Sequence, residues 1–293
     1  SSDVCSSDLV MDLSKELSTA IELAHRAGDA ILEIYGQDFT AEEKIGADDF
    51  AEPVTEADRI ASRLIVEGLS KEFSRDAILS EEEVDNPEDR LQKSRTWMID
   101  PIDGTLGFIR RDGDFAVQIG LAENGTPILG VVHLPFFGET LFAAKGCGAH
   151  VRRSGSDEKL NVSELVDLQS ATLASSRNHR SVKMNRVVET FGLRNEVQRG
   201  SVGLKIGLIA SRETDIYIHL SPRTKYWDTC APQAIIEEAG GTMTDLFGEP
   251  LRYDSSDVRN LNGIVASNGV IHLETLKKLK PLLTEFGRLR VIV

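Results

Sequence analysis

Three short acidic segments that lie far apart in the chain place the strongest constraint on its fold: Ser80-Glu81-Glu82, Asp100 to Thr105, and Trp227-Asp228. Hard divalent cations such as Mg²⁺ bind oxygen ligands, and several carboxylates can lie close together at neutral pH only when cations offset their mutual repulsion. We therefore expect a fold in which these segments meet around metal ions. Such a cluster indicates chemistry at phosphate.

The composition excludes several classes of protein. With 293 residues, 41% of them hydrophobic and 27% charged, the chain can form one large domain or two of ordinary size. No apolar run approaches the roughly 18 to 20 residues of a membrane span. The net charge of −14 and the pI near 4.9 argue against a nucleic-acid polymer as partner, because nucleic-acid binders carry basic faces.

The cysteines indicate where in the cell the protein is located, and the first residues indicate where the native sequence begins. Cys5, Cys147 and Cys230 lack the CxxC spacing of a zinc site, and such sparse usage fits a reducing cytoplasm, where we expect the protein to be located. The polar stretch SSDVCSSDL lacks the basic and apolar regions of a signal peptide. VCSSDL can be read as a translated sequencing adapter, so we expect residues 1–10 to be a non-native leader before Met11.

Hydrophobic spacing predicts an α/β protein in two halves. Apolar residues recur at helical spacing over 13–35 and 55–73, with a charged loop expected between them over 40–52. Short buried strands are expected at 77–79 and 96–99, and each ends at an acidic motif. An antiparallel meander is expected over 115–122, 128–134 and 140–145, because Asn124-Gly125 between apolar runs is typical of a hairpin.

The second half repeats strands and helices in alternation, which favours another α/β layer. The glycine- and charge-rich stretch 146–159 is the expected boundary, so we divide the chain into an N-terminal α+β half, 11–157, and a C-terminal α/β half, 158–293. We expect strands at 171–175, 216–219, 241–246 and 263–267. We expect helices near Asn185 and over 202–211, 229–239 and 270–286.

The segment Asp100-Pro101-Ile102-Asp103-Gly104-Thr105 is suited to holding a cation beside an anion. Pro101 keeps the backbone out of a helix, so Asp100, Asp103 and the Ile102 carbonyl can face one place. Gly104 and Thr105 follow at a helix start, where free backbone N–H groups can accept a phosphate. The alternative is an ordinary turn, since Asp-Gly is common in turns.

The other acidic groups also have structural alternatives. Glu81 could belong to a solvated acidic loop, and Asp228 could be the N-cap of a helix that begins at Thr229. Thr55 and Asp58 are typical of a capped helix start. Their functional interpretation is that Asp58 holds the Thr105 hydroxyl, which in turn orients a water.

Four ordered motifs resemble the Mg²⁺-dependent, lithium-sensitive phosphatases of the inositol monophosphatase superfamily. They are PVTEAD (Pro53 to Asp58), LSEE (Leu79 to Glu82), WMIDPIDGT (Trp97 to Thr105) and WDTCAPQAIIEEAGG (Trp227 to Gly241). The resemblance covers nearly all of the chain from Met11 onward. It implies a layered αβαβα sandwich of the inositol monophosphatase and fructose-1,6-bisphosphatase type, with the site between its two halves.

Two downstream segments are most similar to the 3′(2′),5′-bisphosphate nucleotidases: SSRNHRS (Ser175 to Ser181) and GSVGLKIGLIA (Gly200 to Ala210). In those relatives the corresponding His, Ser and Lys contact the nucleotide. The resemblance therefore implies that His179, Ser201 and Lys205 bind substrate here.

The resemblance also implies which residues hold two or three Mg²⁺ ions. Glu81, Asp100 and the Ile102 carbonyl would bind one ion, and Asp100, Asp103 and Asp228 a second. Asp58 and Thr105 would position the attacking water, which the ion at Glu81 activates. The backbone of Gly104, Thr105 and Leu106 would share the charge of the phosphate.

Three functions remain open on the sequence. The first is a nucleotidase acting on 3′-phosphoadenosine 5′-phosphate, and the second is an inositol or other sugar-type monophosphatase. Leu106 favours the second, because nucleotidase relatives commonly carry Lys after DGT. The third is a catalytically silent protein that binds a phosphorylated ligand, although all four acidic ligands are present. In each case the partner is a small phosphorylated molecule, and both a monomer and a homodimer are compatible with the sequence.

Overall fold

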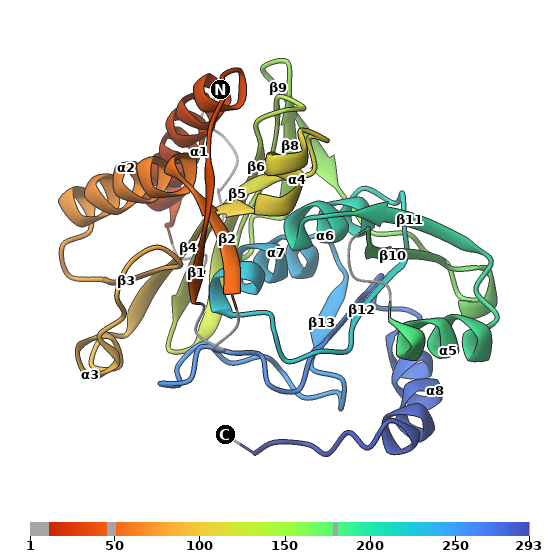
Figure 1. Ribbon diagram of the computed structural model, residues 1–293. Helices are drawn as coiled ribbons and strands as arrows, with labels where there is room; N and C mark the ends of the chain where they lie inside the picture. The colour runs from red at the N-terminus through yellow and green to blue at the C-terminus, as the bar shows by residue number, and fades with distance from the viewer. Residues whose placement is uncertain (1–11, 46–50, 178–180, 293) are drawn as a thin grey trace.

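The computed structural model describes residues 12–45, 51–177 and 181–292, and its elements form five layers of alternating helices and sheets (Figure 1). This is the αβαβα sandwich expected from the sequence. The expected leader, residues 1–10, lies outside the described residues, and so does His179. In the described part of the chain, no helix is both long and apolar enough to cross a membrane.

The larger sheet has seven strands in the order β3-β4-β5-β6-β7-β8-β9. Within this sheet only the β3–β4 pair is parallel, and the expected antiparallel meander forms β5 to β7. The antiparallel pairing continues into β8 and β9. The strands are β3 (Ala77–Ser80), β4 (Arg95–Asp103), β5 (Ala116–Glu123), β6 (Thr126–Leu134), β7 (Glu139–Ala144), β8 (Ala149–Arg153) and β9 (Ser156–Leu160).

Two amphipathic helices cover the outer face of this sheet: α1 (Ser14–Tyr35) and α2 (Glu56–Glu72). Their apolar faces pack on strand residues that include Trp97 and Val117, which are fully buried. The helix α2 begins where the sequence predicts, because Thr55 and Asp58 form a capping box.

The opposite face of the sheet packs on α6 (Val202–Ala210) and α7 (Tyr226–Glu238), which form the middle layer. Two glycines let α7 approach closely: a Cβ on Gly120 would lie 2.8 Å from the Ala231 nitrogen, and one on Gly130 would lie 2.2 Å from the Ala231 oxygen. These glycines therefore let α7 lie close to β5 and β6, next to β4, which carries Asp100 and Asp103.

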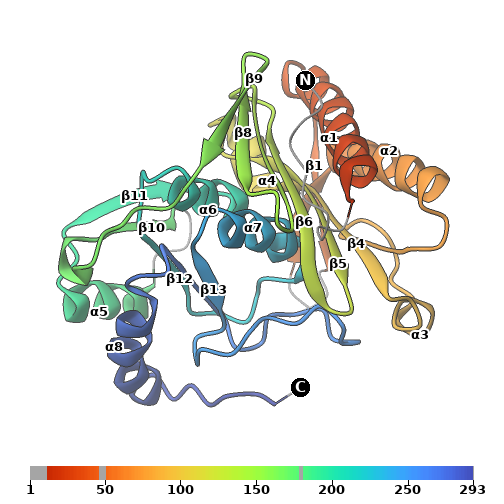
Figure 2. The same ribbon diagram turned by 180° about the vertical axis from the view of Figure 1, so that it is seen from behind.

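A second sheet has five strands in the order β11-β10-β12-β14-β13. Figure 2 shows its strands β10 to β13 on the side of α6 and α7 that is opposite to β5 and β6. Its strands are β10 (Thr172–Ser176), β11 (Asn195–Arg199), β12 (Ile216–His219), β13 (Thr242–Thr244) and β14 (Ile264–Ser267). The helices α5 (Val182–Phe191) and α8 (His272–Glu285) form the outermost layer and share an apolar core with this sheet. Short helical turns lie at α3 (Pro87–Arg90), α4 (Thr105–Arg110) and η1 (Leu168–Ser170).

Three segments form strands where none was expected. The expected loop over 40–52 contains β1 (Ala41–Ile45) and the start of β2 (Ala51–Thr55), which pair with each other. The stretch 146–159 contains β8 and most of β9, so the seven-stranded sheet continues through it; the division into two halves stays an interpretation. The edge strand β11 was not expected. The strands β1, β9 and β11 are rich in charged residues and lack the apolar alternation that identifies a strand. In β8 the alternation is limited to Ala149 and Val151.

Candidate active site

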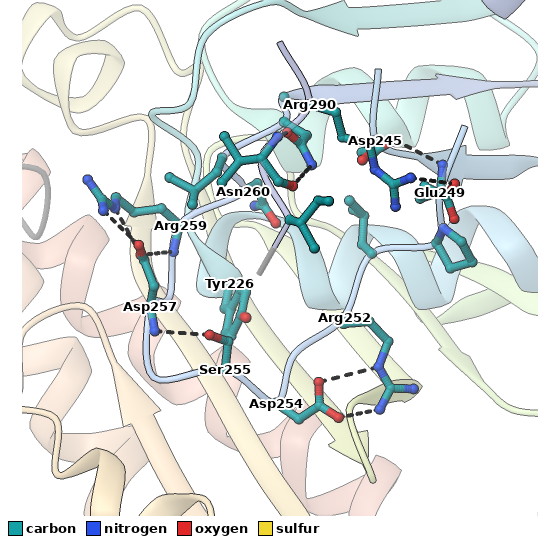
Figure 3. Close-up of a pocket in the computed structure, with 17 residues that line it drawn as sticks. Tyr226, Asp245, Glu249, Arg252, Asp254, Ser255, Asp257, Arg259, Asn260 and Arg290 are labelled. Carbon is teal, nitrogen blue, oxygen red and sulfur yellow. Dashed lines mark hydrogen bonds and ion pairs between the residues drawn. The ribbon is translucent and has the colours of Figure 1, made fainter. Parts of the chain in front are cut away.

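A cavity of about 510 Å³ is lined mainly by residues 245–263, the connection between β13 and β14 (Figure 3). The acidic motifs do not line it. None of its lining residues is a site residue expected from the sequence. Its arginines pair with neighbouring carboxylates, in the pairs Arg252–Asp254, Arg259–Asp257 and Arg290–Glu249. This cavity is therefore separate from the place where the acidic motifs meet.

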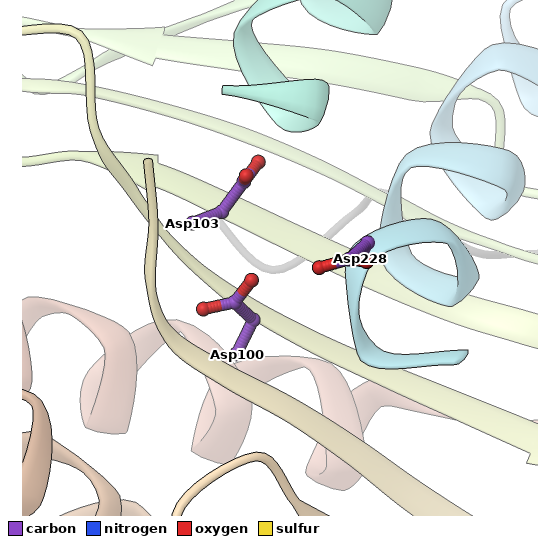
Figure 4. Close-up of side chains that lie close together, drawn as sticks. All are labelled: Asp100, Asp103 and Asp228. Atoms are coloured by element: carbon purple, nitrogen blue, oxygen red, sulfur yellow. The ribbon is translucent and has the colours of Figure 1, made fainter. Parts of the chain in front are cut away.

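Asp100, Asp103 and Asp228 converge, with one carboxylate oxygen from each lying within 4.8 Å of the others (Figure 4). The first two belong to β4 and the third to α7. Residues three apart on a regular strand point to opposite faces, but the pairing of β4 with β5 shifts register between Asp100 and Asp103. This irregularity at Pro101 brings both carboxylates to one place.

Burial and mutual repulsion keep these carboxylates from ionising freely. Burial raises the pKa of Asp228 to about 8 and that of Asp100 well above its usual range, with the charge of Glu81 adding to both shifts. Burial also raises the pKa of Asp103. Asp100 Oδ1 is buried and has no hydrogen-bond partner among the described residues. Three converging carboxylates, of which Asp100 and Asp103 are buried and Asp228 is partly exposed, fit a hard cation such as Mg²⁺, and so does the unpartnered oxygen of Asp100.

One alternative from the sequence, that Asp228 is the N-cap of its helix, is wrong. The helix α7 begins three residues earlier than expected, and Asp228 lies at its third position. There Oδ2 accepts a 2.6 Å hydrogen bond from the backbone N–H of Lys225, the residue at the N-cap. One carboxylate oxygen therefore fixes the start of α7, and the orientation of the side chain is set by the helix.

The expected pair Asp58 and Thr105 lies beside the cluster. Thr105 Oγ1 is 3.5 Å from Asp58 Oδ1 and 3.2 Å from the Ile102 carbonyl oxygen. Burial raises the pKa of Asp58 to about 7, although hydrogen bonds from Thr55 oppose the shift. The structure thus brings together the carboxylate, the hydroxyl and the carbonyl that the sequence analysis assigned to water and metal.

The expected phosphate-binding segment opens the short helix α4. Gly104 is its N-cap with φ of 98°, and a Cβ there would lie 2.5 Å from the Asp114 oxygen. Only glycine fits this left-handed turn beside another backbone segment. Thr105 and Leu106, the next two residues, form the start of the helix.

Two of the three expected substrate-binding residues lie at the start of α6, next to Asp103. The Ser201 hydroxyl caps α6 and donates a 2.5 Å hydrogen bond to Asp103 Oδ2. The Lys205 ammonium is buried 5.1 Å from the centroid of the Tyr217 ring, and burial lowers its pKa to about 8. His179 lies outside the described residues.

The structure adds polar residues that the sequence analysis missed. Lys44 of β1 bonds to Glu81 and Glu82, so the β1–β2 hairpin lies over this side of the cluster. Asp114 accepts a hydrogen bond from the Gly200 N–H and pairs with Arg177 at 3.0 Å, which joins the loop after α4 to the second half. Gln118 of β5 bonds to Asp103. A glutamine inside an otherwise apolar strand was the available signal for this last residue.

Comparison with known proteins identifies the family. Residues 12–284 match the model of the inositol monophosphatase family. The 3′(2′),5′-bisphosphate nucleotidase CysQ of Aggregatibacter actinomycetemcomitans is 34% identical over 82% of this chain and 88% of its own length. A fructose-1,6-bisphosphatase/inositol-1-monophosphatase of Thermotoga maritima is 32% identical over 92% of this chain and 98% of its own.

Solved structures agree with this result. A Thermotoga maritima IMPase aligns with a TM-score of 0.79 and 30% identity, covering 93% of this chain and all of that one. CysQ from Bacteroides thetaiotaomicron aligns with a TM-score of 0.73 and 28% identity, over 88% of this chain and 98% of its own. The chain belongs to the inositol monophosphatase family and is a phosphatase of that family.

Proposed function

We propose that this phosphatase is a Mg²⁺-dependent 3′(2′),5′-bisphosphate nucleotidase that converts 3′-phosphoadenosine 5′-phosphate to AMP and phosphate. The observation that carries the proposal is the convergence of Asp100, Asp103 and Asp228 with Lys205 nearby. The positive charge of Lys205 interacts with Asp103 and Asp228, so a buried cation lies beside the acidic cluster. Such a pairing suits a substrate with two phosphates, one over the metal ions and one near Lys205.

Two or three Mg²⁺ ions would be held by the acidic residues and one carbonyl. Glu81, Asp100 and the Ile102 carbonyl form one set of ligands, and Asp100, Asp103 and Asp228 form a second. Bound Mg²⁺ would supply charge that stabilises the transferring phosphoryl group and lowers the pKa of a water ligand. The unpartnered oxygen of Asp100 supports this assignment.

The side chains of the protein would position the water and the phosphate. Asp58 holds the Thr105 hydroxyl, which leaves the hydroxyl oxygen free to accept a hydrogen bond from the attacking water. The first backbone amides of α4, at Gly104, Thr105 and Leu106, would donate to the phosphate oxygens. No covalent intermediate is required. The buried Cys230 is not suited to form one, because burial raises the pKa of its thiol.

A second candidate is an inositol or other sugar-type monophosphatase. Leu106 favours it, because a leucine supplies no cation next to the phosphate. The similarity to the fructose-1,6-bisphosphatase/inositol-1-monophosphatase of Thermotoga maritima, at 32% identity, also supports it. The resemblance of SSRNHRS and GSVGLKIGLIA to nucleotidases, together with the 34% identity to a CysQ, favours the first candidate.

A panel of substrates distinguishes the candidates. We would measure Mg²⁺-dependent phosphate release from 3′-phosphoadenosine 5′-phosphate, inositol 1-phosphate, fructose 1,6-bisphosphate and histidinol phosphate, each with and without lithium. The matched control is Asp100→Asn protein purified in parallel, which reports any contaminating phosphatase. Preference for the nucleotide with lithium inhibition is the expected result. Preference for a sugar phosphate would establish the second candidate, and no release from any of them would contradict both.

A further inference from the structure

One oxygen of Asp103 accepts hydrogen bonds from three different donors. Oδ2 receives the Gln118 side-chain N–H at 2.5 Å, the Ser201 hydroxyl at 2.5 Å and the Gly203 backbone N–H at 2.8 Å. Gln118 comes from β5 and the other two from the start of α6. Figure 4 shows the Asp103 carboxylate pointing toward that helix, while Asp100 and Asp228 point toward one another. Oδ2 is therefore fully engaged, and Oδ1 is left for a cation.

Packing alone does not explain a glutamine at position 118. Its side chain is fully buried, on the face of β5 where Ala116 and Gly120 pack toward the middle layer. Its carbonyl, Oε1, has no hydrogen-bond partner among the described residues. A buried carbonyl without a partner destabilises the fold, and an apolar side chain of the same length would avoid that cost. Among the described residues, its side chain donates only to Asp103.

The surroundings hold these donors in place. A Cβ on Gly203 would lie 2.8 Å from Val132 Cγ1 and 3.3 Å from Gln118 Cδ. The absence of a side chain at Gly203 therefore lets α6 approach β5 closely enough for its N–H to reach Asp103. Gln118, which pairs with Val132 of β6, packs against the first turn of α6 at Gly203.

We propose that Gln118 is a positioning residue for metal binding, which holds the Asp103 carboxylate so that only Oδ1 serves as a ligand. The proposal rests on the metal-dependent function proposed above. Loss of a residue that orients a metal ligand typically costs roughly 10- to 100-fold in metal affinity or activity. Without the Gln118 donor, only Ser201 and Gly203 of α6 hold Oδ2, and the side of the carboxylate that faces β5 loses its hydrogen bond.

The test is Gln118→Met, which keeps the length of the side chain and removes both its donor and its unpartnered carbonyl. We expect Mn²⁺ binding to metal-free protein, measured by isothermal titration calorimetry, to weaken by about 10- to 100-fold. The melting temperature in EDTA should stay the same or rise. The Mg²⁺ concentration for half-maximal phosphate release should increase by a similar factor. A purely structural role predicts the reverse, a lower melting temperature and unchanged Mn²⁺ affinity.

Gln233→Met is the matched control, because Gln233 is also a buried glutamine that donates to a carboxylate, Glu237, at 2.7 Å. It should lower the melting temperature and leave Mn²⁺ affinity unchanged. If Gln118→Met does not fold, Gln118→Asn shortens the amide by one methylene and should also weaken Mn²⁺ binding. Wild-type affinity in a folded Gln118 variant overturns this inference alone. Failure of the wild-type protein to bind Mn²⁺ overturns the proposed metal dependence as well.

Discussion

The Thr105 hydroxyl lies 3.5 Å from Oδ1 of Asp58, a residue 47 positions earlier in the chain. Oδ2 of the same carboxylate accepts hydrogen bonds from the backbone N–H and the hydroxyl of Thr55, at 2.7 and 2.6 Å. The capping box of α2 thus orients Asp58, and Oδ1 faces the start of α4. The Asp58 side chain can therefore cap α2 through Oδ2 and hold the Thr105 hydroxyl through Oδ1.

Replacing Thr105 with valine should slow turnover without preventing folding. Valine has the same shape but cannot donate to Asp58 or accept from a water, so we expect kcat to fall by about 10²- to 10⁴-fold with little change in KM. The control is Thr275→Val in α8, a fully buried threonine that donates to the Ile271 carbonyl four residues earlier. Near-normal kcat in Thr105→Val would exclude this hydroxyl from the reaction.

The metal-free protein should lose stability as the pH rises from about 6.5 to 8. Burial raises the pKa of Asp58 to about 7 and that of Asp228 to about 8, so in this range the folded state binds more protons than the unfolded chain. By linkage, the free energy of unfolding then decreases with pH. Below about pH 6.5 the buried His133 and His272 act in the opposite direction, because burial lowers the pKa of each to about 4. Near pH 8 Lys205 also acts in the opposite direction, because burial lowers its pKa to about 8, so the decrease should be steepest between about pH 6.5 and 7.5.

Mg²⁺ should reverse this trend, since it favours the ionised carboxylates. We expect 10 mM Mg²⁺, roughly a working concentration for a weak oxygen-ligand site, to raise the melting temperature by several degrees more at pH 8 than at pH 6. Differential scanning calorimetry with EDTA or Mg²⁺ at both values makes the comparison. A melting temperature that rises from pH 6.5 to 8 in EDTA is incompatible with a buried acidic cluster.

Much of this site could be predicted because its residues lie in short motifs with strong local preferences. Asp100, Asp103 and Gly104 occur within five residues, and Thr55 with Asp58 has the spacing of a capping box. The start of α7 was misplaced for a local reason as well. Its N-cap is Lys225, and lysine is not among the residues that usually cap helices.

The remaining parts depend on contacts between distant segments. The β1–β2 hairpin has a charged sequence without apolar alternation, and its position depends on Lys44 bonding to Glu81 and Glu82. Gln118 meets Asp103 only through the shifted register of β4 against β5 and the docking of α6. No periodicity within a single segment carries that information.

Replacing Asp100 with asparagine should abolish turnover while preserving the fold. Asn removes one of three mutually repelling charges, so the melting temperature in EDTA at pH 8 should stay the same or rise. Loss of a shared metal ligand should cost more than about 100-fold in kcat/KM, beyond the loss expected for a residue that only orients a ligand. Added Mg²⁺ should no longer raise the melting temperature. Retained activity would reject the assignment of Asp100 to the metal ions.

Two glycine-to-alanine substitutions distinguish the stability lost through a close backbone contact from the stability lost through a left-handed backbone conformation. Gly104→Ala should destabilise the protein by about 2 to 4 kcal/mol, because φ is 98° and the new Cβ would lie 2.5 Å from the Asp114 oxygen. Gly155→Ala is the control: φ is 79° but nothing lies within 4 Å, so about 1 kcal/mol is expected. Urea denaturation measures both. Equal losses would mean that the contact with Asp114 relaxes without cost.

Lys205 provides the sharpest test of substrate class. We expect Lys205→Met to raise KM for 3′-phosphoadenosine 5′-phosphate by about tenfold or more, because the substrate loses a hydrogen bond from a charged group. The effect on KM for 3′-AMP should be smaller. The two substrates share the scissile phosphate and differ in the 5′-phosphate alone. Lys278→Met, on the exposed side of α8, is the control and should change neither value.

The pH dependence of KM gives a second, independent reading of the same residue. Burial lowers the pKa of Lys205 to about 8, so its positive charge is lost as the pH rises through that value. In the wild-type protein, KM for the bisphosphate should therefore rise between pH 7 and 9 more steeply than KM for 3′-AMP. In Lys205→Met this difference between substrates should disappear. Equal pH profiles for the two substrates in the wild type would place the second phosphate away from Lys205, and the sugar-phosphate candidate would then be favoured.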